Sequence, residues 1–131
     1  MRHRKKLNTL GLKKSHRDSL LKNLIASLVI NEKIKTTDRR AKALAQRFGR
    51  LMSLVKKQET REAIRTIAGY AFTMAASRKL IAELKPRYET RTSGFTRITR
   101  LGLRKGDNAL LVQIELVGQG PSRKLRRQLS P

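Results

Sequence analysis

Hydrophobic and polar positions recur along this chain with two different periods, and the change between them separates a helical part from a β-rich part. Between residues 16 and 30, aliphatic residues recur every four positions in two adjacent rows: Leu20, Leu24, Leu28 and Leu21, Ile25, Val29. This spacing predicts one amphipathic helix with an apolar stripe. Ser15 is the expected N-cap with Asp18 at the capping-box position, and Asn31 is the expected C-cap.

The same periodicity predicts three further helices, over residues 38–56, 60–69 and 73–84. Thr37 is the expected cap of the first of these helices. Asp38 follows in its first turn, where the helix dipole favours a carboxylate. Pro86 is expected to stop the last helix, because proline has no backbone N–H to donate.

The remaining apolar positions alternate as they do in β-strands. The short segment 33–36 predicts an edge strand whose lysines keep other strands away. Segments 95–101 and 109–117 predict two longer strands, and Gly106-Asp107-Asn108 between them is typical of the turn of an antiparallel hairpin. The predicted fold class is α+β, with four or so helices packed on a small sheet.

The strand over 95–101 has an ambiguous inner face. Residues 98 and 100 of an extended strand share one face, whereas 97, 99 and 101 share the other, so Ile98 and Leu101 compete for burial. Either one arginine points near the core face, or the strand twists between the two apolar residues.

Charge changes this picture, because 32 Lys and Arg stand against 9 Asp and Glu, for a formal net charge of +23. Such a chain repels itself, so a polyanion is needed to offset the charge, and nucleic acid is the commonest one. Residues 1–14 are basic without a sustained apolar period, which predicts an extended arm reaching on the order of 46 Å. Residues 119–131 predict a flexible basic tail, which leaves 15–118 as a single domain.

Residues suited to catalysis or metal binding are scarce. The chain has no cysteine, and neither His3 nor His16 has a partner at metal-ligand spacing. The glycine-containing loop 102–106 lacks the pattern of a phosphate-binding loop. We therefore expect no enzyme activity, no metal, no cofactor and no small-molecule substrate.

A membrane location is also not expected. The longest uncharged run, 67–77, is shorter than the roughly 20 residues of a membrane span. No apolar stretch follows the basic N-terminus, so a secretory signal is not expected and the predicted location is cytoplasmic.

Candidate RNA-binding residues are cations in three places. On the arm they are expected to become ordered along phosphates. On the hairpin, phosphate contact is favoured because no acidic residues are expected to pair with the arginines, whereas the basic face of helix 38–56 is equally compatible with simple solvation. The predicted set is Arg2, His3, Arg4, Lys5, Lys6, Lys13, Lys14, His16, Arg17, Arg39, Arg40, Lys42, Arg97, Arg100, Arg104 and Lys105.

Aromatic residues are few, and Tyr88 and Phe95 are the only easy candidates for stacking on RNA bases. Recognition is therefore expected to depend on the RNA backbone and on RNA shape.

Short motifs along the chain point to a family. In order, they are MRHRK at 1–5, SHR at 15–17, IKTT at 34–37 with Ala41-Lys42, LKPRY at 84–88, SGFTRI at 93–98, RKGDN at 104–108 and IELV at 114–117. In this order and spacing they resemble the bacterial-type large ribosomal subunit protein seventeen family over about residues 1–118. The resemblance implies that segment 33–36 joins the hairpin, which gives a three-stranded sheet, expected to be mixed.

The resemblance also implies a structural role in the large ribosomal subunit, near the polypeptide exit region. Its implied partners are large-subunit rRNA and neighbouring ribosomal proteins. RNA contacts of the family carry over to Arg2, His3, Arg4, Lys5, His16, Arg17, Arg97, Arg104 and Lys105. The chain departs from the family pattern at Ser93-Gly94-Phe95, where Gly-Gly-Tyr is usual, and across 6–14, which lacks the usual Leu-X-Arg pattern.

Two other classes of protein compete with this interpretation. A nucleoid-associated or helix-turn-helix DNA-binding protein would use helices 16–30 and 38–56, but the connection 31–37 exceeds the turn of about 3–4 residues in that motif. An RNA-modifying enzyme would need a cofactor loop or an acid–base pair, and the sequence offers neither.

Overall fold

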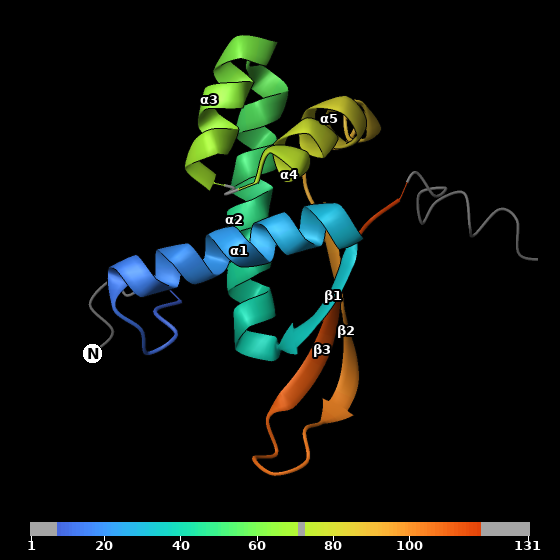
Figure 1. Cartoon of the computed structure of the whole chain (residues 1–131). Coiled ribbons are helices and arrows are strands. Elements are labelled where there is room, and N and C mark those ends of the chain that lie inside the picture. Colours follow the sequence, from blue (N-terminus) through green and yellow to red (C-terminus); the bar gives the residue numbers. More distant parts are fainter. Residues whose placement is uncertain (1–7, 71–72, 119–131) are drawn as a thin grey trace, which may run out of the picture.

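The structure, a computed structural model of the chain, describes residues 8–70 and 73–118 (Figure 1). It confirms the predicted α+β class. Its elements are, in chain order, α1 (Lys14–Asn31), β1 (Lys33–Thr37), α2 (Asp38–Lys57), α3 (Thr60–Tyr70), α4 (Met74–Lys79), the π-helix η1 (Leu80–Leu84), α5 (Lys85–Arg87), β2 (Thr96–Leu103) and β3 (Leu110–Leu116).

The three strands form one sheet in the order β1-β3-β2, and both neighbouring pairs are antiparallel. The expected mixed sheet is therefore wrong. Strands β1 and β2 run in the same direction and would make a parallel pair, but β3 lies between them. β3 takes the central position because Val112, Ile114 and Leu116 on one of its faces are all buried. The register sets Ile34 and Ile98 on either side of Ile114.

A β-bulge in β2 resolves which apolar residue of that strand faces inward. The register with β3 shifts between Arg100 and Gly102, so Leu101 is the extra residue on the bulged strand. Ile98 packs against the core, whereas Leu101 is 48% exposed. The bulge at Leu101 therefore separates the two apolar residues, and both Arg97 and Arg100 are exposed.

The helices predicted over 16–30, 38–56 and 60–69 are confirmed to within two residues at each end. The predicted caps of α1 are wrong. This helix begins one residue before Ser15 with no side-chain cap, and Asp18 instead accepts a hydrogen bond from Arg47. At the other end Asn31 is still helical, and Glu32 takes the left-handed capping conformation with φ 61°.

The last helical stretch continues past the stop expected at Pro86. It widens into η1, where the N–H of Lys85 donates to the carbonyl of Leu80, five residues earlier. A new α-helical turn, α5, then begins, and Pro86 lies in that first turn, where a missing N–H costs nothing. The π-helix thus lets the chain pass proline without a break.

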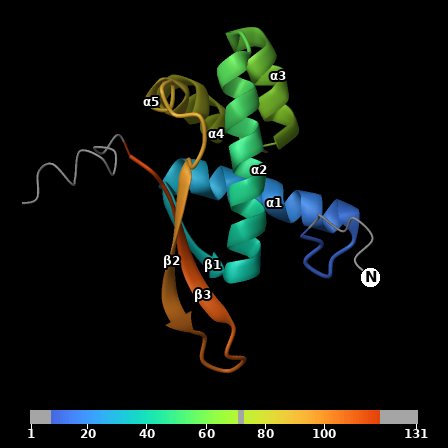
Figure 2. The same ribbon diagram turned by 180° about the vertical axis from the view of Figure 1, so that it is seen from behind.

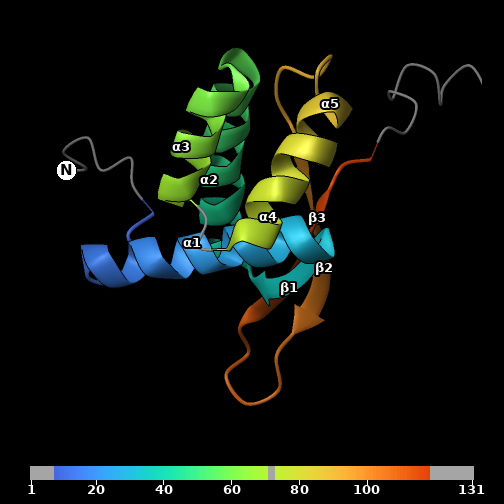
Figure 3. The ribbon, with the colours of Figure 1, turned by 45° about the horizontal axis from the view of Figure 1, so that its top comes forward.

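One hydrophobic core joins the sheet to the helices. Leu28 and Val29 of α1, Phe48 and Leu51 of α2, and Ile114 of β3 are fully buried in it. Figure 3 shows α2 and α3 as neighbours with the α4–α5 stretch beside them, while α1 passes below. Because β1 is hydrogen-bonded into the sheet between α1 and α2, these two helices do not form a helix-turn-helix.

The predicted arm is described only in part. Residues 1–7 lie outside the described residues, as does the predicted tail 119–131. Between residue 8 and the start of α1 the chain makes a turn, in which the N–H of Leu12 donates to the carbonyl of Thr9 at 3.2 Å. Leu10 in this turn packs against the core. The division into arm, domain and tail therefore stays a prediction.

Candidate nucleic-acid interface

The first group of predicted RNA-binding residues surrounds the N-terminal end of α1. Lys13, Lys14 and His16 are exposed there, and Arg17 is half-buried. The first turn of the helix contains no acidic residue. The other members of this group, Arg2, His3, Arg4, Lys5 and Lys6, lie outside the described residues. The described part of the arm thus brings a cluster of cations to one helix end.

The second group lies at the start of α2. Arg39 and Arg40 are exposed, and the Lys42 ammonium lies 2.7 Å from the Asp38 carboxylate. Thr37, just before the helix, is paired with Leu111 at the beginning of β3, so this end of α2 adjoins the turn end of the hairpin. The start of α2 and the projecting half of the hairpin lie at the same end of the molecule (Figure 1).

The third group lies on the hairpin, where the expected lack of acidic neighbours is wrong. Antiparallel pairing sets Arg97 opposite Glu115, and their charged groups are 3.5 Å apart. At the tip, Arg104 donates two hydrogen bonds to Asp107. The first cause of the lowered pKa of Asp107, about 2, is this guanidinium, and the N–H of Ala109 adds to it. Arg100 and Lys105 are exposed and have no ion pair within the described part of the chain.

The aromatic residues expected to stack on bases are not available for stacking. Tyr88 is 1% exposed and Phe95 is 3% exposed, and their rings pack edge to face with centroids 5.2 Å apart. The Tyr88 hydroxyl donates to the carbonyl of Phe95 at 3.4 Å, and burial raises the pKa of this phenol. Both rings are part of the hydrophobic core, and the sequence pattern alone did not predict their burial.

Two cations outside the predicted set lie beside the α1 cluster. Arg47 donates a 2.8 Å hydrogen bond to Asp18, and its guanidinium lies over the Tyr70 ring, 5.4 Å from the centroid. This hydrogen bond is the first cause of the lowered pKa of Asp18. Arg50, one turn further along α2, lines the same hollow as Arg17 and Arg47. Both belong to the basic face of α2, but only tertiary packing brings them to α1.

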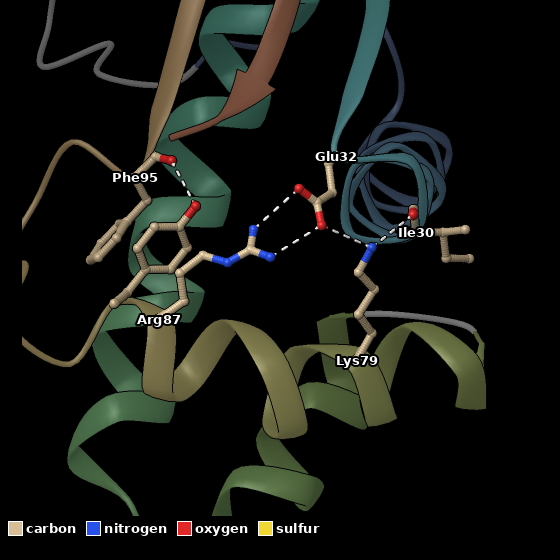
Figure 4. A network of polar contacts seen from close by, with 6 residues as sticks. Ile30, Glu32, Lys79, Arg87 and Phe95 are labelled. Carbon is tan, nitrogen blue, oxygen red and sulfur yellow. Dashed lines mark hydrogen bonds and ion pairs between the residues drawn. The ribbon is translucent and has the colours of Figure 1, made fainter. Parts of the chain in front are cut away.

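A contrasting junction at the other end of α1 is held together by charge. The Glu32 carboxylate accepts two hydrogen bonds from Arg87, both 3.2 Å long, and forms an ion pair with Lys79 at 3.1 Å (Figure 4). Lys79 also donates to the carbonyl of Ile30 at 3.0 Å. These contacts, with Arg87 first, lower the pKa of Glu32. They fasten α1 to the α4–α5 stretch.

Two general features complete the description of the site. Across residues 8–70 and 73–118, no three His, Cys, Asp or Glu side chains come together as a metal site would require. Within the same ranges, no helix combines the length and the apolar character needed to cross a membrane.

The fold and its surface define the class first: a small, strongly basic α+β domain with exposed cations on two helix ends and a projecting hairpin. A family model described as Ribosomal protein L17 matches residues 20–117. The chain therefore belongs to the ribosomal protein L17 family, as its motif order predicted. This is a family of ribosomal proteins and not a family of enzymes.

Individual relatives agree with the family match. The chain is 38% identical over 127 residues to the "Large ribosomal subunit protein bL17" of Geobacter sulfurreducens, an alignment covering 97% of this chain and 72% of the relative. It is 41% identical over 108 residues to the protein of the same name from Syntrophomonas wolfei, covering 82% of this chain and 95% of the relative. The bL17 of Syntrophotalea carbinolica is 40% identical over 134 residues, with 97% and 81% covered.

Proposed function

We propose that this chain is a non-catalytic, structural constituent of the large subunit of the cytoplasmic ribosome that binds large-subunit rRNA and stabilises its fold. Its family and its similarity to large ribosomal subunit proteins bL17 support assembly into the large subunit. Neighbouring large-subunit proteins are its further partners. The position near the polypeptide exit region follows from the family resemblance.

One observation carries the RNA-binding part of the proposal. Even if each of the 9 acidic residues neutralised one cation, a charge of +23 would remain. Several acids are already engaged in internal pairs, such as Asp18 with Arg47 and Asp107 with Arg104. Lys13, Arg39, Arg40 and Lys105 are exposed and form no ion pair within the described residues, and Lys14 is exposed as well. Such groups bind phosphates and release the counterions condensed on RNA.

The mechanism that follows is charge neutralisation at several separate surfaces. Backbone contacts do not depend on base identity, so they hold RNA segments in register by shape. The start of α1 lies away from the start of α2 and the hairpin, which share one end of the molecule (Figure 1). The protein is therefore suited to bridge RNA segments that approach it from more than one side.

Sedimentation through a sucrose gradient tests this function. At moderate salt, we expect the full-length protein to co-migrate with large ribosomal subunits and to leave them only at high salt, because phosphate contacts are salt-dependent. Co-migration with the nucleoid, or a position at the top of the gradient, would contradict the proposal.

The location is tested separately by cross-linking within purified large subunits. An amine-reactive reagent on exposed lysines such as Lys14 and Lys105 is expected to capture proteins that border the polypeptide exit. Cross-links exclusively to proteins of the subunit-joining face would overturn the location while leaving rRNA binding intact.

A further inference from the structure

A groove runs along α2, beside the segment that leads into β2. It consists of two adjoining hollows of about 690 Å³ and about 310 Å³, which share Gln46, Arg50 and Tyr70 in their walls. Each lies within the range of about 300–1,000 Å³ that is usual for binding sites of small organic groups. In Figure 2, α2 lies in front of α1, with the segment leading into β2 on one side and α3 on the other.

The larger hollow is mainly apolar and has a flat floor. Ala45, Gly49 and Ser53 follow one another at four-residue spacing on α2, so they lie on one face of the helix. Apart from the backbone of α2 itself and the two neighbouring residues, no atom lies within 4 Å of where a side chain at Gly49 would begin, so the floor opens into free space. Leu54 and Phe95 provide apolar walls. A flat apolar ring can lie in such a space.

The smaller hollow is cationic. Arg17, Arg47 and Arg50 line it, with Asp18 as the single carboxylate. Asp18 is engaged by Arg47, which leaves Arg17 and Arg50 to face a ligand. Asn8 also lines this hollow. The charge at this end of the groove is complementary to a phosphate.

We propose that the groove binds one unpaired nucleotide of RNA, with its phosphate at Arg17 and Arg50 and its base over Gly49 beside Tyr70. This inference rests on the proposed rRNA binding and names a site for it. A phosphate joined to a flat ring matches a cationic hollow joined to an apolar one, and unpaired bases are the parts of RNA that proteins bind individually. An apolar peptide would match only one of the two hollows.

The site is tested by filling its floor. Gly49→Leu adds a side chain into open space, and it also raises helix propensity, so α2 is expected to remain folded. Gly69→Leu is the matched control, because Gly69 lies in α3, is exposed, has an equally open Cβ position and does not line the groove. Thermal unfolding of both variants checks that each stays folded.

The readout is chemical probing of purified large-subunit rRNA bound to each full-length protein. We expect the wild type and Gly69→Leu to protect one unpaired base from dimethyl sulfate or an equivalent base-specific reagent, while Gly49→Leu leaves that base reactive. Affinity for the rRNA should fall about tenfold in Gly49→Leu, as expected for the loss of one stacked base. The salt dependence should not change, because no cation is removed.

Each result has a distinct meaning. If Gly49→Leu keeps every protection of the wild type, or if the protected bases are all paired, the groove does not hold a nucleotide and the inference is wrong. An apolar segment of a neighbouring protein in the groove would give this same result on naked rRNA. If the wild type fails to bind the rRNA at all, the proposed function itself fails.

Discussion

The two ends of α1 use charge in opposite ways. At the C-terminal end, Glu32 is held by Arg87 and Lys79, and the N–H of Leu116 in β3 donates to its carbonyl at 2.8 Å. The left-handed conformation of Glu32 is uncommon for a residue other than glycine, and these contacts offset its cost. Here opposite charges hold elements of the fold together.

At the N-terminal end, cations are placed where they weaken the free helix. Lys13 and Lys14 lie at the positive end of the helix dipole, and no acidic residue in the first turn balances them. An arrangement that costs stability in the free protein becomes favourable when a polyanion binds. Ion pairs at the C-terminal end of α1 thus stabilise the fold, whereas exposed cations at its N-terminal end favour binding of a polyanion. Substitutions at either end test this difference.

The largest expected effect on stability comes from the core residue Ile114 of β3. Ile114→Ala removes a fully buried side chain that lies between Ile34 and Ile98 in the sheet. The free energy of unfolding should fall by about 2–5 kcal/mol, while rRNA affinity of the folded fraction changes little. Chemical denaturation and filter binding measure the two quantities. A stable variant that loses RNA affinity would show that the sheet face contacts RNA.

A smaller effect is expected from the Glu32 junction. Glu32→Gln keeps the shape of the side chain but removes its charge, so stability should fall by about 1 kcal/mol, a low value because the carboxylate is 40% exposed. Glu89→Gln, at an exposed position, is the control and should have no measurable effect. An unchanged Glu32→Gln melting curve would mean that this junction does not stabilise the fold.

The pH dependence of this junction follows from the lowered pKa of Glu32, caused first by Arg87. Because the folded protein holds the carboxylate ionised at a lower pH than the unfolded chain does, the contribution is complete above the ordinary pKa of about 4.5. It is lost as the pH falls through the lower pKa of the folded state. The stability difference between wild type and Glu32→Gln should thus be constant near neutral pH and shrink in acid.

At the N-terminal end of α1, a single substitution should raise stability and lower rRNA affinity. Lys14→Glu places a carboxylate at the positive end of the dipole, so the free protein should gain about 0.3–1 kcal/mol of stability. Its rRNA affinity should nevertheless fall, because a cation near phosphate has become an anion. Lys14→Gln separates loss of the cation from gain of the anion. If Lys14→Glu binds rRNA as well as wild type does, this helix end is not part of the interface.

The smallest effect is expected at the hairpin tip. Lys105 is exposed, unlike Arg104, which is engaged by Asp107. Lys105→Ala should change stability by less than about 0.5 kcal/mol and make the salt dependence of RNA binding shallower by about 1. An unchanged salt dependence would remove the tip from the interface.

Much of the fold could be predicted from the sequence because local periodicity dominates it. The helical spacing of leucines in α1 and the change to alternation before β2 were sufficient to assign the elements. Features decided by tertiary contacts could not be predicted in this way. β1 pairs with β3 because β3 is the most buried strand, and the chain passes Pro86 because a π-helix precedes it.

Only those residues of the candidate site could be predicted from the sequence whose exposure follows from their charge. Exposure of Lys13, Lys14, Arg39 and Arg40 agrees with the predicted basic surfaces. The ion pair between Arg97 and Glu115 depends on strand register, and the meeting of Arg17 with Arg50 depends on how α1 packs on α2. Such contacts join residues far apart in sequence, so composition and spacing did not reveal them.

The central claim is that exposed cations bind rRNA phosphates, and its most direct test is the salt dependence of the affinity for purified large-subunit rRNA. If about 8 phosphates are neutralised, a plot of the logarithm of the binding constant against that of the salt concentration should have a slope of about −6 to −7. A slope shallower than about −3 would mean that few of the cations contact RNA, and it would contradict the account.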